Sequence, residues 1–268
     1  MLVSIIVPAY RQERTIKKDI KNIYDSMLQT RWDFELIVVV DGKVDKTLKE
    51  AKKVKGENIK IFGYDKNFGK GYAIKYGMAR SSGDIVAFID AGMDIDPNGV
   101  SMLLEHMEWY EADIVVGSKK HPAARCNYPL IRRAYSWWYY LLIKILFGLK
   151  VKDTQTGLKV FKRKVLVKVL PRLLVKEFAF DIEILAVARH LGFTRIYEAP
   201  TKVEWKYSAT SFRHFLFNDP HIRKIFWDTL AVFYRLKIQR YYDNGSKRRW
   251  VYDKDLEMRI NTGEMGDG

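Results

Sequence analysis

Short apolar runs alternate along the first half of the chain with basic stretches whose apolar residues recur at helical spacing. Residues 3–8 are apolar and β-branched and end at a proline, and residues 14–28 follow with a helical period. Residues 34–40 are too uniformly apolar for a half-exposed strand, which is typical of a buried parallel strand. The same patterns predict further helices over 47–55, 71–81 and 99–110 and further strands over 59–62, 84–89 and 113–116. Strands that alternate with helices indicate an α/β sheet.

Two aspartates stand where predicted strands end. Ligands of α/β sheets bind at the carboxyl ends of the strands, and Asp41 and Asp90 both fall there. A turn after Asp90 could bring Asp94 beside it around one hard cation, Mg²⁺ or Mn²⁺, which is typically bound by one or two carboxylates together with substrate phosphates. Such a cation makes a diphosphate a better leaving group. The alternative is a strand-end turn with solvated acids.

The turn after the first strand disfavours two familiar nucleotide-binding folds. Dehydrogenase-type Rossmann domains need a G-x-G-x-x-G turn there, and P-loop proteins need G-x-x-x-x-G-K-[ST]. The chain has Pro8, Ala9, Tyr10 and Arg11 instead. Neither dinucleotide nor P-loop chemistry is therefore expected.

Three segments carry further candidates for ligand contact. Lys70 lies between two glycines ahead of a predicted helix, so that backbone amides and the lysine could meet a phosphate; a helix N-cap with a solvated lysine is the alternative. Gln155 lies in a polar loop, residues 153–157, ahead of a strand over 158–161, and a ligand contact explains its amide better than a turn does. Asp181 opens a helix over 180–191 in an apolar context, so we expect a cationic or hydroxyl-rich partner, such as Lys159 or a sugar, although acids also favour a first helical turn.

Charge is concentrated in the middle of the chain. The 268 residues carry a formal net charge of +15, and residues 119–176 hold 15 basic side chains and one acidic one. Phosphates of nucleic acid, of a membrane surface or of a lipid-linked substrate would all be attracted by this segment. Nucleic acid is disfavoured because it leaves the strand order and Asp90 without a role. One cysteine, Cys126, fits a reducing compartment, and no signal peptide or spanning segment is visible.

Aromatic and basic residues mark two candidate membrane-surface helices. Residues 136–147 are apolar and aromatic but too short to span a bilayer, and Arg132 and Arg133 precede them, placed to reach a headgroup or acceptor phosphate. Residues 222–238 are amphipathic, with basic residues off the apolar face. A buried core helix is the alternative for both segments.

Seven stretches in the same order and spacing resemble family 2 glycosyltransferases, most of all the dolichyl-phosphate mannose synthases and glucosyltransferases. The resemblance covers residues 1 to about 207. The stretches are SIIVPAY (4–10), ELIVVVDGKVDKT (35–47), NFGKGYAIKYGMA (67–79), GDIVAFIDAGMDIDP (83–97), GSK (117–119), DTQTGLKVFKR (153–163) and FAFDIEILA (178–186). The family's fold is GT-A, a Rossmann-like mixed sheet flanked by helices, here followed by C-terminal amphipathic helices.

The resemblance also implies roles for individual residues. Pro8, Ala9, Tyr10 and Asp41 match positions that hold the base and ribose of a nucleotide sugar, and Lys119 matches an arginine near the phosphates. Asp90 matches the first aspartate of the D-x-D metal motif, in which Gly92 replaces the central acid, and Asp94 matches an acidic position of some members. Asp153, Gln155 and Lys159 fall in the acceptor-side loop, and Asp181 and Glu183 in the helix that faces the sugar.

We therefore predict an inverting, metal-assisted transfer of a hexose from a GDP- or UDP-sugar to a polyprenyl phosphate, at the cytoplasmic face of a membrane. Residues 1–118 form the nucleotide-sugar half and 119–207 the acceptor half of one domain, followed by interfacial helices over 208–243 and a polar tail over 244–268. Lys119, Arg132 and Arg133 would position the acceptor phosphate, and Asp90 with its metal would stabilise the departing diphosphate. Two alternatives remain: transfer to a glycan hydroxyl, with Asp181 or Glu183 as base, and a sugar-nucleotide-binding protein that has lost catalysis.

Overall fold

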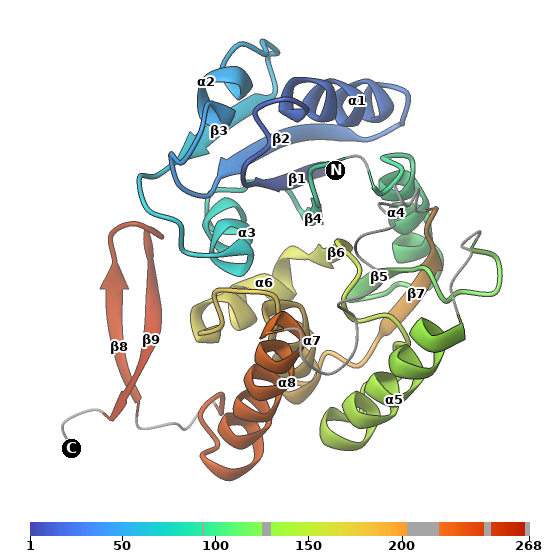
Figure 1. Cartoon of the computed structure of the whole chain (residues 1–268), viewed down its shortest axis with the longest axis vertical. Coiled ribbons are helices and arrows are strands. Elements are labelled where there is room, and N and C mark those ends of the chain that lie inside the picture. The colour runs from blue at the N-terminus through green and yellow to red at the C-terminus, as the bar shows by residue number, and fades with distance from the viewer. Residues whose placement is uncertain (93, 125–129, 203–219, 244–247, 266–268) are drawn as a thin grey trace.

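A seven-stranded sheet forms the centre of the computed structural model, which describes residues 1–92, 94–124, 130–202, 220–243 and 248–265 (Figure 1). Side chains of residues 130–135, 220–222, 248 and 263–265 lie outside the description. The strands of the sheet are β1 (Leu2–Ala9), β2 (Asp33–Val40), β3 (Ile59–Gly63), β4 (Ile85–Ile89), β5 (Ile114–Ser118), β6 (Leu158–Lys162) and β7 (Ile196–Pro200). Their order is β3-β2-β1-β4-β6-β5-β7. The α/β sheet predicted from the alternating pattern is confirmed.

Helices cover both faces of this sheet (Figure 1). They are α1 (Ile16–Leu28), α2 (Thr47–Ala51), α3 (Lys70–Ala79), α4 (Gly99–Trp109), α5 (Leu130–Phe147), α6 (Arg163–Val169), α7 (Phe180–His190) and α8 (Pro220–Phe233), with short turns η1 (Leu170–Arg172) and η3 (Tyr234–Ile238). Side chains of a strand alternate between its faces. In β2, Ile37 and Val39 accordingly pack against α3, whereas Leu36 and Val38 belong to the core under α1, α2 and α4. Burial on both faces explains the uninterrupted apolar run.

Strand β6 runs antiparallel to both of its neighbours, β4 and β5, whereas the other adjacent strands are parallel. Leu158 at the start of β6 pairs with Ile89 at the end of β4. The loop before β6 therefore lies beside the residue that follows β4. This reversal brings residues 153–157 to Asp90, and the amide of Asp90 donates to the carbonyl of Gly157 over 2.9 Å.

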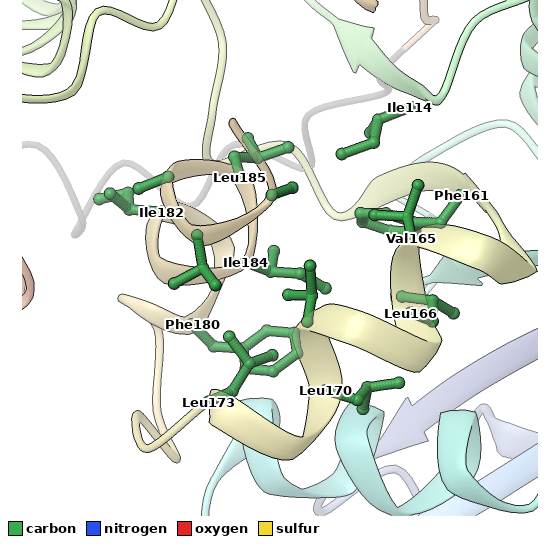
Figure 2. Close-up of a cluster of buried hydrophobic side chains, with 14 of the residues drawn as sticks. Ile114, Phe161, Val165, Leu166, Leu170, Leu173, Phe180, Ile182, Ile184 and Leu185 are labelled. Carbon is green, nitrogen blue, oxygen red and sulfur yellow. The ribbon is translucent and has the colours of Figure 1, made fainter. Parts of the chain in front are cut away.

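The core behind β6 is built from α6, η1 and α7 (Figure 2). Figure 2 shows side chains from these three elements gathered in one apolar cluster, including Val165, Leu170, Phe180 and Ile184. Helix α6 and strand β7 were not predicted from the sequence, α1 begins two residues later than expected, and α2 ends four residues earlier than expected. Phe180, the first residue of α7, is buried in this cluster, so that packing fixes the start of the helix that carries Asp181.

The C-terminal part of the chain packs on the same core. Val232 and Leu236 are buried in it and Thr229 is fully covered, so this part of the predicted apolar face packs on the protein's own core. The stretch expected to be a polar tail contains an antiparallel hairpin, β8 (Arg248–Asp253) and β9 (Met258–Met265). Among the described residues, no helix has both the length and the apolar character needed to span a bilayer.

Candidate active site

Asp41 fixes the loop that leads into α3. It follows β2 and is buried, and its carboxylate accepts hydrogen bonds from the amides of Phe68 and Gly69 over 2.8 and 2.9 Å. Its own amide donates to the carbonyl of Ala9 over 2.9 Å. Both carboxylate oxygens of Asp41 thus hold the loop from which Lys70 projects, and this positioning role was not foreseen from the sequence.

Lys70 lies between two carboxylates. Its ammonium is 2.8 Å from Oδ2 of Asp90 and 3.7 Å from Oδ2 of Asp181. Burial by itself lowers the pKa of Lys70, but the two carboxylates outweigh this effect and raise the pKa above its ordinary value. Lys70 is therefore charged at neutral pH, and the alternative of a solvated lysine is wrong because its side chain is only 18% exposed.

A second lysine continues this chain of charges into the interior. Lys159 has no exposed side-chain surface, and its ammonium forms a short ion pair with Oδ1 of Asp181 and donates to the carbonyl of Thr156 over 2.6 Å. The partner expected for Asp181 is thus confirmed. Burial lowers the pKa of Lys159, and the opposing charge of Asp181 works against this shift.

The loop before β6 closes on Asp90 from the other side. A Cβ placed on Gly157 would lie 1.9 Å from Oδ2 of Asp90, so that only glycine fits at this position. In the same loop, Nε2 of Gln155 is buried without a hydrogen-bond partner among the described residues. Buried amides are normally paired, and a ligand at this point would supply the missing acceptor.

The metal expectation fits Asp90 better than Asp94. Oδ1 of Asp90 is buried and has no hydrogen-bond partner in the described part of the chain, which suits a cation ligand. Asp94 is exposed, and the described residues contain no cluster of three or more acids, histidines or cysteines. Gly92 has a φ of +110° and donates its amide to Asp19 over 3.1 Å, so this position favours glycine for its backbone. Mg²⁺ needs only one or two protein carboxylates.

The predicted nucleoside contacts lie at the end of β1. Tyr10 is 39% exposed, and the guanidinium of Arg11 stacks 5.2 Å from its ring centre. A hollow of about 540 Å³ lies alongside, lined by residues 11–15, Val44 and Asp45. Pro8 is partly buried and Ala9 is buried, so Tyr10 is the one of the three with substantial exposed surface.

The predicted acceptor-phosphate residues are only partly described. The amide of Lys119, after β5, donates to Oδ2 of Asp153 over 3.1 Å, which joins this turn to the loop before β6. Glu198 of β7, which no sequence motif indicates, accepts a hydrogen bond from the amide of Asp153 over 3.0 Å. Arg132 and Arg133 belong to the first turn of α5, and their side chains lie outside the described residues.

Glu183 has a structural role instead of the catalytic one considered for it. It is fully buried and accepts the amide of Val175 over 2.9 Å and the hydroxyl of Tyr242 over 2.6 Å. Burial raises the pKa of Glu183, and these hydrogen bonds only partly oppose it. Tyr242 was missed because no sequence pattern connects it with Glu183.

Comparison with known proteins decides the family. The model of the glycosyl transferase family 2 matches residues 4–170. The chain belongs to this family. Among curated relatives, a dolichyl-phosphate beta-glucosyltransferase of Dictyostelium discoideum is 29% identical to the chain over 205 residues. The match covers 71% of the chain and 63% of that protein. A dolichyl-phosphate beta-glucosyltransferase of Trichomonas vaginalis is 30% identical, covering 88% of the chain and 75% of that protein.

A more distant relative also matches by sequence, and solved structures share the fold. A dodecaprenyl-phosphate galacturonate synthase of Rhizobium johnstonii is 27% identical, over 62% of the chain and 49% of that protein. The chain thus spans 49–63% of the length of several curated relatives. Mannosyl-3-phosphoglycerate synthase from Rubrobacter xylanophilus superposes with a TM-score of 0.65 at 14% identity, covering all of this family 2 chain and 85% of its own. Glucosyl-3-phosphoglycerate synthase from Mycobacterium tuberculosis, crystallised with Mn²⁺ and UDP, superposes with a TM-score of 0.62 at 19% identity. The superposition covers 97% of this chain and 86% of that protein. The expected GT-A fold is confirmed.

Proposed function

We propose that the protein transfers a hexose from a nucleoside diphosphate sugar to a polyprenyl phosphate, with inversion and with Mg²⁺ or Mn²⁺ bound at Asp90. The observation that carries the proposal is the pairing of Lys70 with Asp90 at the carboxyl end of β4, where Gly157, in the same loop as Gln155, also contacts Asp90. Family membership and relatives that are dolichyl-phosphate glucosyltransferases support the choice of donor and acceptor classes.

In the proposed reaction, a phosphate oxygen of the acceptor attacks the anomeric carbon of the sugar. A bond forms between that oxygen and the carbon while the bond from the carbon to the diphosphate oxygen breaks, and the nucleoside diphosphate leaves. Asp90 would hold the divalent cation, which supplies charge neutralisation for the leaving diphosphate. Lys70 would donate to the same diphosphate, and Gln155 would orient a sugar or phosphate group.

The state of the two candidate bases supports a phosphate acceptor. A phosphate dianion is already deprotonated near neutral pH and needs no general base, whereas a glycan hydroxyl does. Asp181 is held by Lys159 and Lys70, and Glu183 is held by backbone amides and Tyr242. Neither carboxylate is thus placed as a free base, which disfavours transfer to a hydroxyl.

Aromatic side chains at one end of the molecule support a membrane-surface location. Helices α5 and α8 pack together there, with Tyr139 and Thr229 joined over 3.2 Å (Figure 1). Trp138 and Trp227 are 65% and 63% exposed on these helices. Tryptophan favours the headgroup region of a bilayer, and nearby basic residues favour an anionic surface. We infer that these helices hold the protein at the cytoplasmic face of a membrane, near its lipid acceptor.

A panel of GDP- and UDP-sugars with a short polyprenyl phosphate tests the proposal, with lipid-linked product measured by mass. We expect one hexose to be transferred in the presence of Mg²⁺ or Mn²⁺, and no product with Asp90→Asn. Transfer to a glycan but not to the polyprenyl phosphate would show that the acceptor group is a glycan hydroxyl. Donor binding without hydrolysis or transfer would identify a protein that has lost catalysis.

A further inference from the structure

Two lysines and two carboxylates form an unbroken series of ion pairs beneath the end of β4. From the interior outwards the series runs Lys159, Asp181, Lys70 and Asp90. Lys159 is completely buried, Asp181 is 2% exposed, and the side chain of Asp90 is 36% exposed. The four formal charges cancel. A charge series of this kind is balanced as it stands, before any ligand is bound.

One of the two carboxylate oxygens of Asp90 is already paired with Lys70, and the other is not. Oδ2 of Asp90 contacts Lys70 at 2.8 Å, while Oδ1 is buried without a hydrogen-bond partner in the described residues. A divalent cation at Asp90 would therefore meet the ammonium of Lys70 at the same carboxylate. Asp181 offers this ammonium a second carboxylate, 3.7 Å away.

We propose that Lys70 is a resident counter-ion of Asp90 that a divalent cation displaces, and that the displaced ammonium moves towards Asp181 and the diphosphate of the donor. This inference rests on the proposed function, because it takes a nucleoside diphosphate as the ligand. A cation alone adds two positive charges to a balanced and partly buried site, which is unfavourable. The negative charges of a diphosphate would cancel this added positive charge. Metal and nucleotide therefore bind as a coupled pair, and each binds weakly alone.

Lys159 fixes the position of the second carboxylate that Lys70 contacts. Its ammonium is held by Asp181 and by the carbonyl of Thr156, and it has no exposed surface, so it keeps the carboxylate of Asp181 in place. Asp181 therefore remains a fixed second partner for Lys70. In this arrangement Asp181 and Lys159 are positioning residues, whereas Lys70 is the group that contacts the ligand.

Titration of the full chain with Mn²⁺ tests the proposal, with binding measured by calorimetry and by the electron paramagnetic resonance signal of free Mn²⁺. Without nucleotide, Lys70→Met and Lys70→Gln should bind Mn²⁺ about tenfold more tightly than the wild-type protein, because the competing ammonium is gone. The same variants should bind UDP or GDP about tenfold more weakly in the absence of metal. Lys70→Arg, which keeps the charge, should bind Mn²⁺ as weakly as the wild type does.

The control is Lys66→Met, which removes an exposed lysine four residues earlier in the same loop and should change neither affinity. Mn²⁺ affinity that is unchanged or lower in both neutral Lys70 variants would overturn the proposal. If one of these variants does not fold, the other decides. The Mn²⁺ titration without nucleotide involves no donor, acceptor or turnover. Its result therefore stands even if the transfer panel shows that the proposed function is wrong.

Discussion

The hydroxyl of Tyr242 donates a hydrogen bond to the carboxylate of Glu183 over 2.6 Å and thereby connects the C-terminal part of the chain with α7. Both residues are fully buried. The same carboxylate holds the amides of Leu174 and Val175, so one acid connects three separate segments. This connection explains why the C-terminal residues belong to the core although the family motifs end well before them.

Replacing Tyr242 by phenylalanine should lower the free energy of unfolding by about 1–3 kcal/mol, because a buried carboxylate loses a donor. Chemical denaturation at neutral pH measures this change. Tyr252→Phe, at an exposed position of β8, is the control and should have little effect. Equal stability of Tyr242→Phe and the wild-type protein would show that the hydrogen bond does not stabilise the fold.

Glu35 of β2 should make stability depend on acid pH. Its carboxylate accepts from Ser4, Lys60 and Ser82 over 2.6–2.8 Å. Burial by itself raises the pKa of Glu35, but these hydrogen bonds outweigh it and lower the pKa to about 2. The stabilisation is present above the ordinary pKa of 4.5 and is lost as the pH falls towards 2. It amounts to at most about 3 kcal/mol.

Glu35→Gln should therefore be less stable than the wild-type protein at pH 7, and the difference should shrink as the pH falls from about 4.5 towards 2. Urea denaturation at a series of pH values measures this difference. Asp33→Asn, at an exposed position of the same strand, serves as control. A difference that is independent of pH would mean that the ionisation of Glu35 does not contribute.

Gly157→Ala should abolish transfer and lower stability, because its Cβ would lie 1.9 Å from Oδ2 of Asp90. Either the loop before β6 or Asp90 must move. Nucleotide binding and thermal unfolding should be measured together with activity. Gly192→Ala is the control: its φ of +94° is strained for alanine, but no atom lies within 4 Å of the added Cβ. Loss of activity with Gly192→Ala as well would point to general destabilisation.

Asp90→Asn should reduce transfer by several orders of magnitude while leaving the fold intact, and Asp94→Asn should cost far less, because Asp94 is exposed. Steady-state rates across a Mg²⁺ and Mn²⁺ series measure both effects. Gly92→Asp restores the family's central acid but places it at a φ of +110°, so lower stability should accompany any gain in metal affinity. Full activity of Asp90→Asn in excess chelator would count against a metal at this residue.

The paired substitution Trp138→Ser and Trp227→Ser should weaken binding to anionic vesicles at high salt, where the electrostatic part is screened. Each basic residue near the membrane surface contributes about 1 kcal/mol to the binding free energy at low salt. The contribution of the aromatic side chains does not depend on salt. Vesicle sedimentation measures both parts. Trp109→Ser, 83% exposed on α4, should leave binding unchanged. If it weakens binding equally, the surface of α5 and α8 is not the membrane contact.

Strands β1 to β6 and the position of Asp90 could be predicted because each depends on local sequence. Residues 34–40 are apolar throughout, and such a run has few structural alternatives to a buried strand. Asp90 directly follows the last residue of β4, as expected from the end of an apolar run. The partner of Asp181 could also be inferred, because a carboxylate among apolar residues needs a cation.

Contacts between distant residues could not be predicted in the same way. Lys70 and Asp90 are 20 residues apart, and only the fold shows that they meet. Tyr242 and Glu183 are 59 residues apart and share no motif. The amphipathic pattern of α8 was correct, but periodicity identifies an apolar face without identifying what covers it. The hairpin of β8 and β9 was missed, although Trp250 and Tyr252 alternate with polar or smaller residues in β8.

The antiparallel position of β6 also constrains the order in which the protein can form during synthesis. Strand β4 pairs with β1 on one side, and its other edge is paired by β6, which begins 69 residues after β4 ends. Until β6 emerges from the ribosome, the nascent N-terminal half presents β4 as an open edge on a largely apolar sheet. Open edges of this kind template pairing with other chains. Contacts of long sequence separation form slowly. The strand reversal that builds the site is therefore also the step that closes the open edge of β4.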